Sequence, residues 1–162
     1  MTQPPHPALE ALPERLRSPE AQVAVVGLGY VGLPLSMSLA ESGAQVVGLD
    51  LSESLCEALS QGRSHIRDIS NERLQAASQA GGSFRATTDF DVLAGVDAVI
   101  ICVPTPLRKT KDPDISHIVA ASKEVAARAR PGQLIVLEST TYPGTTQELL
   151  APRLQERGLE PG

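Results

Sequence analysis

The sequence predicts a doubly wound α/β fold, in which a parallel sheet has helices on both faces. Short runs of aliphatic and β-branched residues, such as 23–26 and 98–103, alternate along the chain with segments of helical periodicity. These runs are continuously apolar, whereas half-exposed antiparallel strands would alternate polar and apolar residues. Strands that alternate with helices are typical of a parallel sheet covered on both sides.

The first strand follows a proline-rich stretch. Residues 1–20 contain five of the 13 prolines and predict a tail with at most one short helix, around 8–17. We expect a single domain over 21–162, with its first strand starting at Gln22 and its first helix ending at Gly43.

The remaining elements continue the alternation. A second strand over 44–50 is followed by a helix over 52–62 that Ser52 would cap, and 63–82 predicts a loop with a short helix. The later elements are strands at 84–87, 96–104 and 133–140, and helices at 115–130 and 145–157.

Composition argues against several classes of partner. The formal net charge is -5, Trp is absent, and Phe and Tyr number two each, so neither a basic groove nor a stacking platform for nucleic acid is expected. The longest apolar run, 98–103, is too short to span a bilayer, and the first residues show no apolar segment behind a basic one. We therefore expect a cytoplasmic protein with no membrane contact.

The cysteines and histidines do not suggest a metal site. Cys56 falls in a predicted helix and Cys102 inside a predicted strand, where free thiols that serve as packing residues are expected rather than a disulfide. The three histidines are scattered and show no metal-ligand spacing with the cysteines.

A glycine-rich turn links the first strand to the first helix. Gly27, Gly29 and Gly32 have the spacing G-x-G-x-x-G, which is weak evidence alone but typical of dinucleotide binding between a strand and a helix. Gly29 would let the backbone approach a diphosphate, and Gly32 would let the first helix pack closely on the sheet. The residues assigned to the cofactor here are Gly27, Leu28, Gly29, Tyr30, Val31 and Gly32.

An acidic residue ends the second strand, where dinucleotide-binding domains place the group that binds the ribose hydroxyls. Asp50 occupies this position, although it could instead cap the next helix. A carboxylate repels a 2′-phosphate, so NAD is predicted as the cofactor in preference to NADP.

Polar residues also follow the fourth and fifth strands. With the strand order 3-2-1-4-5, these ends would flank the same crevice as the glycine turn. Thr105, between two prolines, could face the cofactor or be a surface residue of a rigid turn. The residues concerned are Val103, Pro104 and Thr105 after the fourth strand, and Glu138, Ser139 and Thr140 after the fifth.

Taken together, four ordered motifs resemble the N-terminal, NAD-binding, Rossmann-like domain of the UDP-glucose/GDP-mannose dehydrogenase family. They are VGLGYVGLP, the aspartate of VVGLD, ICVPTPL followed by PDIS, and LESTTYPGTT, whose wording is most similar to members oxidising UDP-N-acetylhexosamines. The resemblance implies NAD-dependent oxidation of a nucleotide sugar's primary alcohol to a carboxylate through a covalent thioester. It also implies that Thr140 lies beside the reacting centre and that the full-length protein is a homodimer.

This chain departs from the family pattern in two ways. The family's catalytic cysteine, lysine and asparagine belong to later parts of its chains, so residues 1–162 are expected to bind NAD and lack the substrate domains needed for turnover. The stretch 51–55 lacks the basic residue that many members have after the ribose acid. Alternatives left open are another dehydrogenase of hydroxyacid or phosphogluconate type, a nucleotide-sensing module, and a binder of S-adenosylmethionine.

Overall fold

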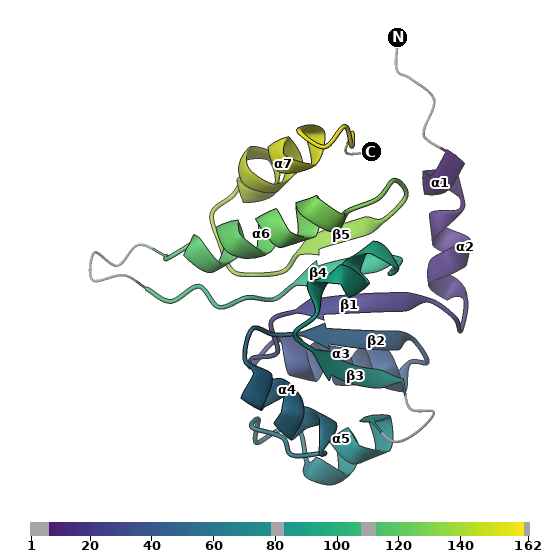
Figure 1. Ribbon diagram of the computed structural model, residues 1–162, viewed down its shortest axis with the longest axis vertical. Helices are drawn as coiled ribbons and strands as arrows, with labels where there is room; N and C mark the ends of the chain where they lie inside the picture. Colours follow the sequence, from purple (N-terminus) through teal and green to yellow (C-terminus); the bar gives the residue numbers. More distant parts are fainter. Residues whose placement is uncertain (1–6, 79–82, 108–112, 161–162) are drawn as a thin grey trace.

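A five-stranded parallel sheet forms the centre of the protein, as the computed structural model shows for residues 7–78, 83–107 and 113–160 (Figure 1). The strand order is β3-β2-β1-β4-β5, and every neighbouring pair is parallel, which confirms the predicted class and order. The strands are β1 (Gln22–Val26), β2 (Gln45–Leu49), β3 (Phe84–Thr87), β4 (Ala98–Ile101) and β5 (Leu134–Leu137).

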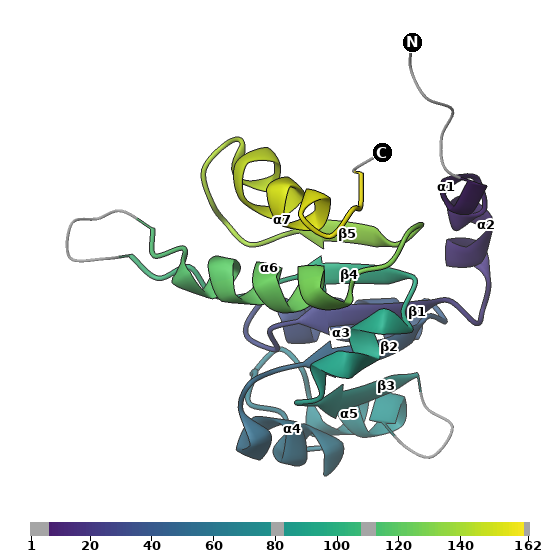
Figure 2. The same ribbon diagram turned by 45° about the horizontal axis from the view of Figure 1, so that its top comes forward.

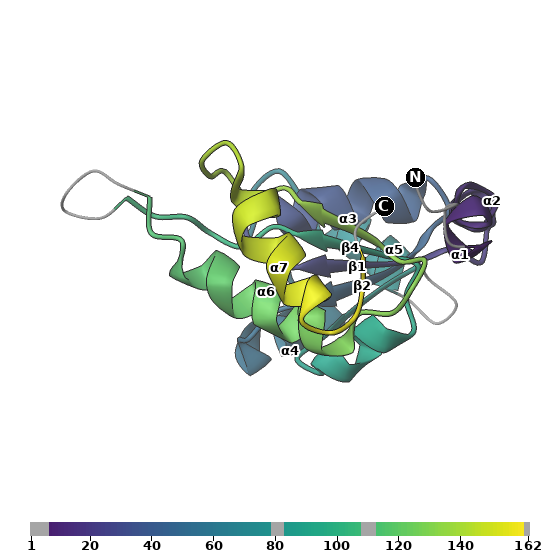
Figure 3. The ribbon, with the colours of Figure 1, turned by 90° about the horizontal axis from the view of Figure 1, so that it is seen from above.

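Helices cover both faces of this sheet. The long helices α3 and α6 lie on opposite sides of the strands (Figure 3), and α7 lies beside α6 near β5 (Figure 2). The helices are α1 (Pro7–Glu10), α2 (Leu12–Arg17), α3 (Gly32–Glu41), α4 (Glu53–Ser60), α5 (Asn71–Ser78), η1 (Phe90–Ala94), α6 (Ser116–Arg128), η2 (Thr146–Leu150) and α7 (Ala151–Gln155).

Strand β1 divides the core into two apolar clusters. Because successive side chains of a strand point to opposite faces, Val25 packs in the cluster under α3, whereas Ala24 and Val26 pack in the cluster under α6. All three residues are buried. This two-sided burial explains why the strand is aliphatic at every position from Val23 to Val26 and not only at alternate ones.

Helix α3 turns a different face to the sheet from the one that simple spacing suggests. The residues Val31, Leu35 and Leu39 have helical spacing, yet none of them is fully buried. The helix instead buries Leu33 and Met37, both completely inaccessible to solvent. The helix is apolar nearly all round, so spacing alone does not identify its packed face.

Two helical segments differ from the prediction. The short 3-10 helix η1, which follows β3, is not predicted from the sequence, because a single turn leaves little periodicity to detect. The last helix, predicted as one piece, begins as the π-helical segment η2 and becomes α-helical at Ala151. Pro152 has no N–H to donate, so the regular hydrogen-bond ladder is interrupted at that point.

The first residues described form two short helices, where at most one is predicted. The Arg15 side chain of α2 pairs with Asp97 at 2.8 Å and donates to the Gly132 carbonyl at 3.1 Å. Asp97 also accepts from the Gln22 backbone N–H, which starts β1. These contacts attach α2 to the amino-terminal edge of the sheet, opposite the edge at which the strands end. No helix within the described residues is long and apolar enough to cross a membrane.

Candidate cofactor site

The strands end at one level along the carboxyl edge of the sheet. In the strand register, Val26 pairs with both Leu49 and Ile101, and Ile101 pairs with Leu137. Each of these residues is the last of its strand. The loops after β1, β2, β4 and β5 therefore start side by side, so the predicted site residues gather along one edge.

The three glycines of the first loop have different surroundings. Gly27 has a φ of +95°, and a Cβ atom there would lie 2.7 Å from the Cys102 carbonyl oxygen. A Cβ on Gly32 would lie 1.7 Å from the Gly27 carbonyl oxygen. A Cβ on Gly29, in contrast, would meet nothing within 4 Å. Gly27 and Gly32 thus allow the backbone to pack closely, whereas Gly29 faces open space.

The loop presents backbone donors at the amino end of α3. Leu33 and Leu35 donate to the carbonyl oxygens of Gly29 and Val31, which starts the helix. Within the described residues, the N–H groups of Gly29, Tyr30 and Val31 donate to no protein group. Tyr30 and Val31 also have exposed side chains. Free N–H groups at a helix start form a favourable environment for an anion.

Asp50 connects the first and second loops. One carboxylate oxygen accepts from the Leu28 N–H at 3.0 Å, and the other accepts from the Ser52 N–H at 3.0 Å. The cap of α4 is Ser52, whose hydroxyl oxygen accepts from the Leu55 N–H, as predicted. Asp50 is therefore not needed for capping, and its half-buried carboxylate lies next to the glycine loop.

The loops after β4 and β5 are joined by a serine. The Ser139 hydroxyl is buried and donates to the carbonyl oxygens of Val103 at 2.9 Å and Ile101 at 3.3 Å. Glu138 and Thr140 on either side of it are exposed, as is Pro104, and Thr105 is half-buried. Ser139 thus holds the two loops together, while its neighbours are accessible to a ligand.

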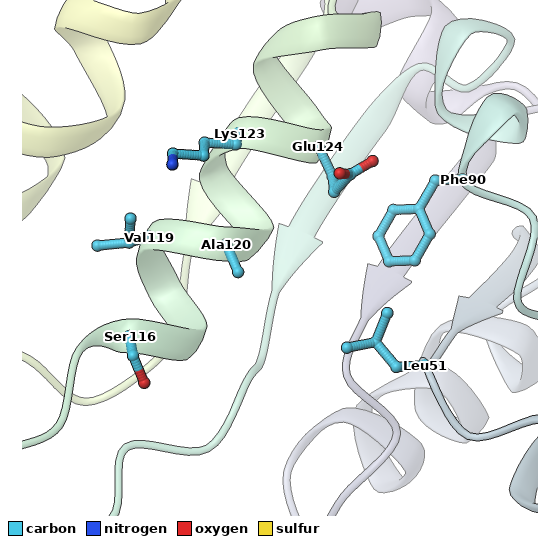
Figure 4. A pocket seen from close by; sticks show the side chains of 7 residues that line it. All are labelled: Leu51, Phe90, Ser116, Val119, Ala120, Lys123 and Glu124. Carbon is cyan, nitrogen blue, oxygen red and sulfur yellow. The ribbon is translucent and has the colours of Figure 1, made fainter.

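A groove that the sequence does not predict begins beside Asp50. It has a volume of about 590 Å³ and lies between α6 and η1. Figure 4 shows Leu51, Phe90, Ala120 and Glu124 facing one another, whereas Lys123 points away from Phe90. The remaining lining residues are Ser116 and Val119. Sequence patterns miss this groove because its walls come from segments that meet only in the folded chain, one of them the single turn of η1.

Both cysteines are free, as expected. Cys56 lies in α4, but the predicted position of Cys102 within a strand is wrong, because β4 ends one residue earlier, at Ile101. Burial, and secondarily the charge of Glu138, raises the pKa of the Cys102 thiol to about 11. No cluster of three or more potential metal ligands exists among the residues described.

We expect Cys102 to resist thiol reagents in the folded protein. Its raised pKa means that the thiolate predominates only above about pH 11, so at pH 8 the group is almost entirely protonated. In a Cys56→Ser variant, an aromatic disulfide reagent should label Cys102 slowly at pH 8 and rapidly after denaturation. Labelling of the native protein as fast as that of the denatured protein would contradict the structure.

These features define a class: a dinucleotide-binding α/β domain with its site at the carboxyl edge of a parallel sheet. A family model described as "UDP-glucose/GDP-mannose dehydrogenase family, NAD binding domain" matches residues 21–160. The chain belongs to the UDP-glucose/GDP-mannose dehydrogenase family and corresponds to its NAD binding domain. This membership favours the predicted family over another dehydrogenase of hydroxyacid or phosphogluconate type and over a binder of S-adenosylmethionine.

Curated relatives share this part of their chains. An NDP-N-acetyl-D-galactosaminuronic acid dehydrogenase of Ralstonia nicotianae is 40% identical over 127 residues, which are 78% of this chain and 29% of the relative. A UDP-N-acetyl-D-mannosamine dehydrogenase of Pyrococcus horikoshii is 36% identical over 141 residues, 87% of this chain and 34% of the relative. The chain thus spans about a third of the length of these relatives.

Solved structures agree with this assignment. An NDP-N-acetyl-D-galactosaminuronic acid dehydrogenase from Methanosarcina mazei superposes with a TM-score of 0.81 at 33% identity, covering 93% of this chain and 34% of that one. The UDP-D-ManNAc dehydrogenase of Pyrococcus horikoshii gives a TM-score of 0.80 at 37% identity, and the match covers 87% of this chain and 34% of that one. The Rossmann-like fold predicted from the sequence is confirmed.

Proposed function

We propose that this chain binds NAD along the carboxyl edge of its sheet. The diphosphate would accept hydrogen bonds from the free N–H groups at the start of α3, where the helix dipole also favours negative charge. Asp50 would accept from the adenosine ribose hydroxyls. The observation that supports this best is the row of N–H groups beside open Gly29 that have no partner among the described residues, with the Asp50 carboxylate bonded to the same loop.

The nicotinamide end would lie by the loops after β4 and β5. Val103, Pro104 and Thr105 would line one side of it, and Glu138, Ser139 and Thr140 the other. The hydrogen bonds from Ser139 to the β4 end support this arrangement, since they bring the two loops together. The resemblance to the family places Thr140 beside the reacting carbon, and its exposure at this edge is consistent with that role.

We infer that the chain supplies the cofactor half of a nucleotide-sugar 6-dehydrogenase of polysaccharide precursor synthesis. Relatives named for UDP-N-acetyl-D-mannosamine support a UDP-N-acetylhexosamine as the substrate. The family's nucleophilic cysteine belongs to later parts of its chains, and both cysteines here are buried with raised pKa values. Residues 1–162 alone should therefore bind NAD without oxidising the sugar. A cytoplasmic location and a homodimeric full-length enzyme are part of the same proposal.

Thermal shift measurements test the cofactor directly. A ligand that binds only the folded chain raises its melting temperature by mass action. NAD should stabilise the chain, whereas S-adenosylmethionine should not, and NADP should do so only at much higher concentration. Stabilisation by S-adenosylmethionine and not by NAD would overturn the proposal. If residues 1–162 alone reduced NAD in the presence of UDP-N-acetylmannosamine, the proposal that this chain does not oxidise the sugar by itself would be wrong.

Changing Asp50 to asparagine is expected to weaken NAD binding about ten- to a hundredfold, because hydrogen bonds to a charged group are lost. NADP binding should change far less, since the substitution also removes the repulsion of the 2′-phosphate. Calorimetric titration with both cofactors measures the ratio of the NAD affinity to the NADP affinity. The exposed Asp68 changed to asparagine removes the same charge elsewhere and should alter neither affinity. An unchanged NAD to NADP ratio in the Asp50 variant would refute the ribose role.

A further inference from the structure

Three hydroxyl side chains follow one another directly after the end of β5, at Ser139, Thr140 and Thr141. The first is bonded to the neighbouring loop, since Ser139 donates to the Val103 carbonyl oxygen. The third lies 3.0 Å from the hydroxyl oxygen of Thr145. The hydroxyl between them, that of Thr140, is exposed and bonds to no group among the described residues. Thr140 is therefore a free hydroxyl between two anchored neighbours.

The same loop contains a tight turn from Tyr142 to Thr145. Its central positions are Pro143 and Gly144, whose φ of +90° is the value that a type II turn requires there. The backbone N–H of Thr145 donates to the Tyr142 carbonyl oxygen at 3.3 Å, and the Thr145 hydroxyl donates to the same oxygen at 2.8 Å. Two hydrogen bonds from this one buried residue thus close the turn.

The direction of the hydrogen bond between the two threonine hydroxyls follows from their protons. A hydroxyl has one proton to donate and two lone pairs that accept. The Thr145 proton is already donated to the Tyr142 carbonyl oxygen, which cannot donate in return. Thr141 must therefore be the donor and Thr145 the acceptor in the 3.0 Å contact. This bond directs the Thr141 side chain toward the turn and away from the position of Thr140.

Thr145 is also the residue at which the loop meets the helical segment η2. The Glu148 N–H of η2 donates to the Gly144 carbonyl oxygen at 2.9 Å. Leu150, at the end of η2, is only 2% exposed, so it anchors this segment in the core. The packing of η2 therefore sets the position of Thr145, and the hydrogen bond from Thr141 extends that constraint to the residue next to Thr140.

We propose that Thr145 is a positioning residue for the nicotinamide end of the cofactor site, because it holds the loop after β5 in the shape that presents the Thr140 hydroxyl. Thr145 does not itself meet the cofactor, since its side chain is buried and its proton is used within the loop. The inference rests on the proposed function, because the shape of this loop affects NAD only if the nicotinamide end lies against it.

Comparison of NAD with ADP tests this role, since ADP has the adenosine and the diphosphate but lacks the nicotinamide riboside. Thr145→Val, made in the 162-residue chain, removes the hydroxyl and keeps a branched side chain of similar size. Calorimetric titration should show about tenfold weaker NAD binding, because the loss of a hydrogen bond loosens the loop. ADP affinity should change less than about twofold, because ADP would contact only the glycine loop and Asp50. A merely structural role would weaken both ligands together.

Two further variants accompany this measurement. Thr145→Ser retains the hydroxyl, so its NAD affinity should lie within about twofold of that of the unaltered chain. Thr146→Val is the matched control, since Thr146 is the next residue, is exposed, and has a hydroxyl with no partner among the described residues. It removes a hydroxyl from the same helical segment and should alter neither the NAD affinity nor the ADP affinity.

The results distinguish a failure of this inference from a failure of the proposal beneath it. If the unaltered chain binds neither NAD nor ADP, the proposed function fails and the inference fails with it. If Thr145→Val leaves the ratio of NAD affinity to ADP affinity unaltered, or if Thr145→Ser does not restore that ratio, only the role of Thr145 is overturned. Should Thr145→Val not fold, as judged by circular dichroism, Thr141→Val breaks the same link from its other end. It should lower the ratio about threefold, and an unchanged ratio overturns the inference.

Discussion

Replacing Gly32 by alanine is expected to destabilise the domain and abolish NAD binding. The new Cβ would lie 1.7 Å from the Gly27 carbonyl oxygen and 2.9 Å from its carbonyl carbon. Both are backbone atoms of the loop itself, so the clash is relieved only if α3 moves away from β1. Overpacking of this kind costs about 3 kcal/mol or more in the free energy of unfolding. Chemical denaturation and NAD titration measure the two effects.

Gly95 changed to alanine is the control for the Gly32 variant. The Cβ there would make only an ordinary contact, 3.6 Å from the Val92 carbonyl oxygen. Stability and NAD affinity should both stay near those of the unaltered chain. A Gly32→Ala protein as stable as the Gly95→Ala protein would show that the loop does not pack as described.

Replacing Gly29 by alanine should affect binding and spare the fold. A Cβ there meets nothing within 4 Å, and the backbone at Gly29 does not have a positive φ. The free energy of unfolding should stay the same or rise by up to about 1 kcal/mol, because alanine restricts the unfolded chain. NAD affinity should fall about a hundredfold, since the methyl group occupies the space through which the diphosphate approaches the N–H groups.

Comparison of Gly29→Ala with Gly32→Ala separates effects on folding from effects on NAD binding alone. Loss of NAD binding in a fully folded Gly29→Ala protein can only be a local effect, whereas the Gly32 variant loses both properties. If Gly29→Ala binds NAD as tightly as the unaltered chain, the diphosphate does not lie against this loop.

Much of the fold can be predicted from the sequence because its strands are buried on both faces. Residues 23–26 of β1 and all of β4 are aliphatic, so their pattern clearly predicts buried strands, and the glycine turn marks where β1 ends before α3. The packed face of α3 could not be predicted, since polar residues do not define its exposed side. The short 3-10 helix η1 could not be predicted either, because it depends on tertiary packing beneath α6.

The candidate site also has residues that can be predicted from the sequence and contacts that cannot. Gly29 and Asp50 can be found from spacing, because dinucleotide binding requires these residue types at fixed offsets in a strand-turn-helix unit. The hydrogen bond from the Ser139 hydroxyl to the Val103 carbonyl oxygen could not be found, because it joins residues that are 36 positions apart. The same applies to Glu124 and Phe90, whose proximity results from the packing of α6 on η1.

A crystal structure of the chain grown with saturating NAD tests the central claim most directly. We expect diphosphate oxygens about 3 Å from the backbone nitrogens between Gly29 and Gly32, which is a hydrogen-bonding distance. We also expect the hydroxyls of the adenosine ribose to contact the carboxylate of Asp50. An empty glycine loop at saturating NAD, or NAD bound at another surface, would contradict this claim.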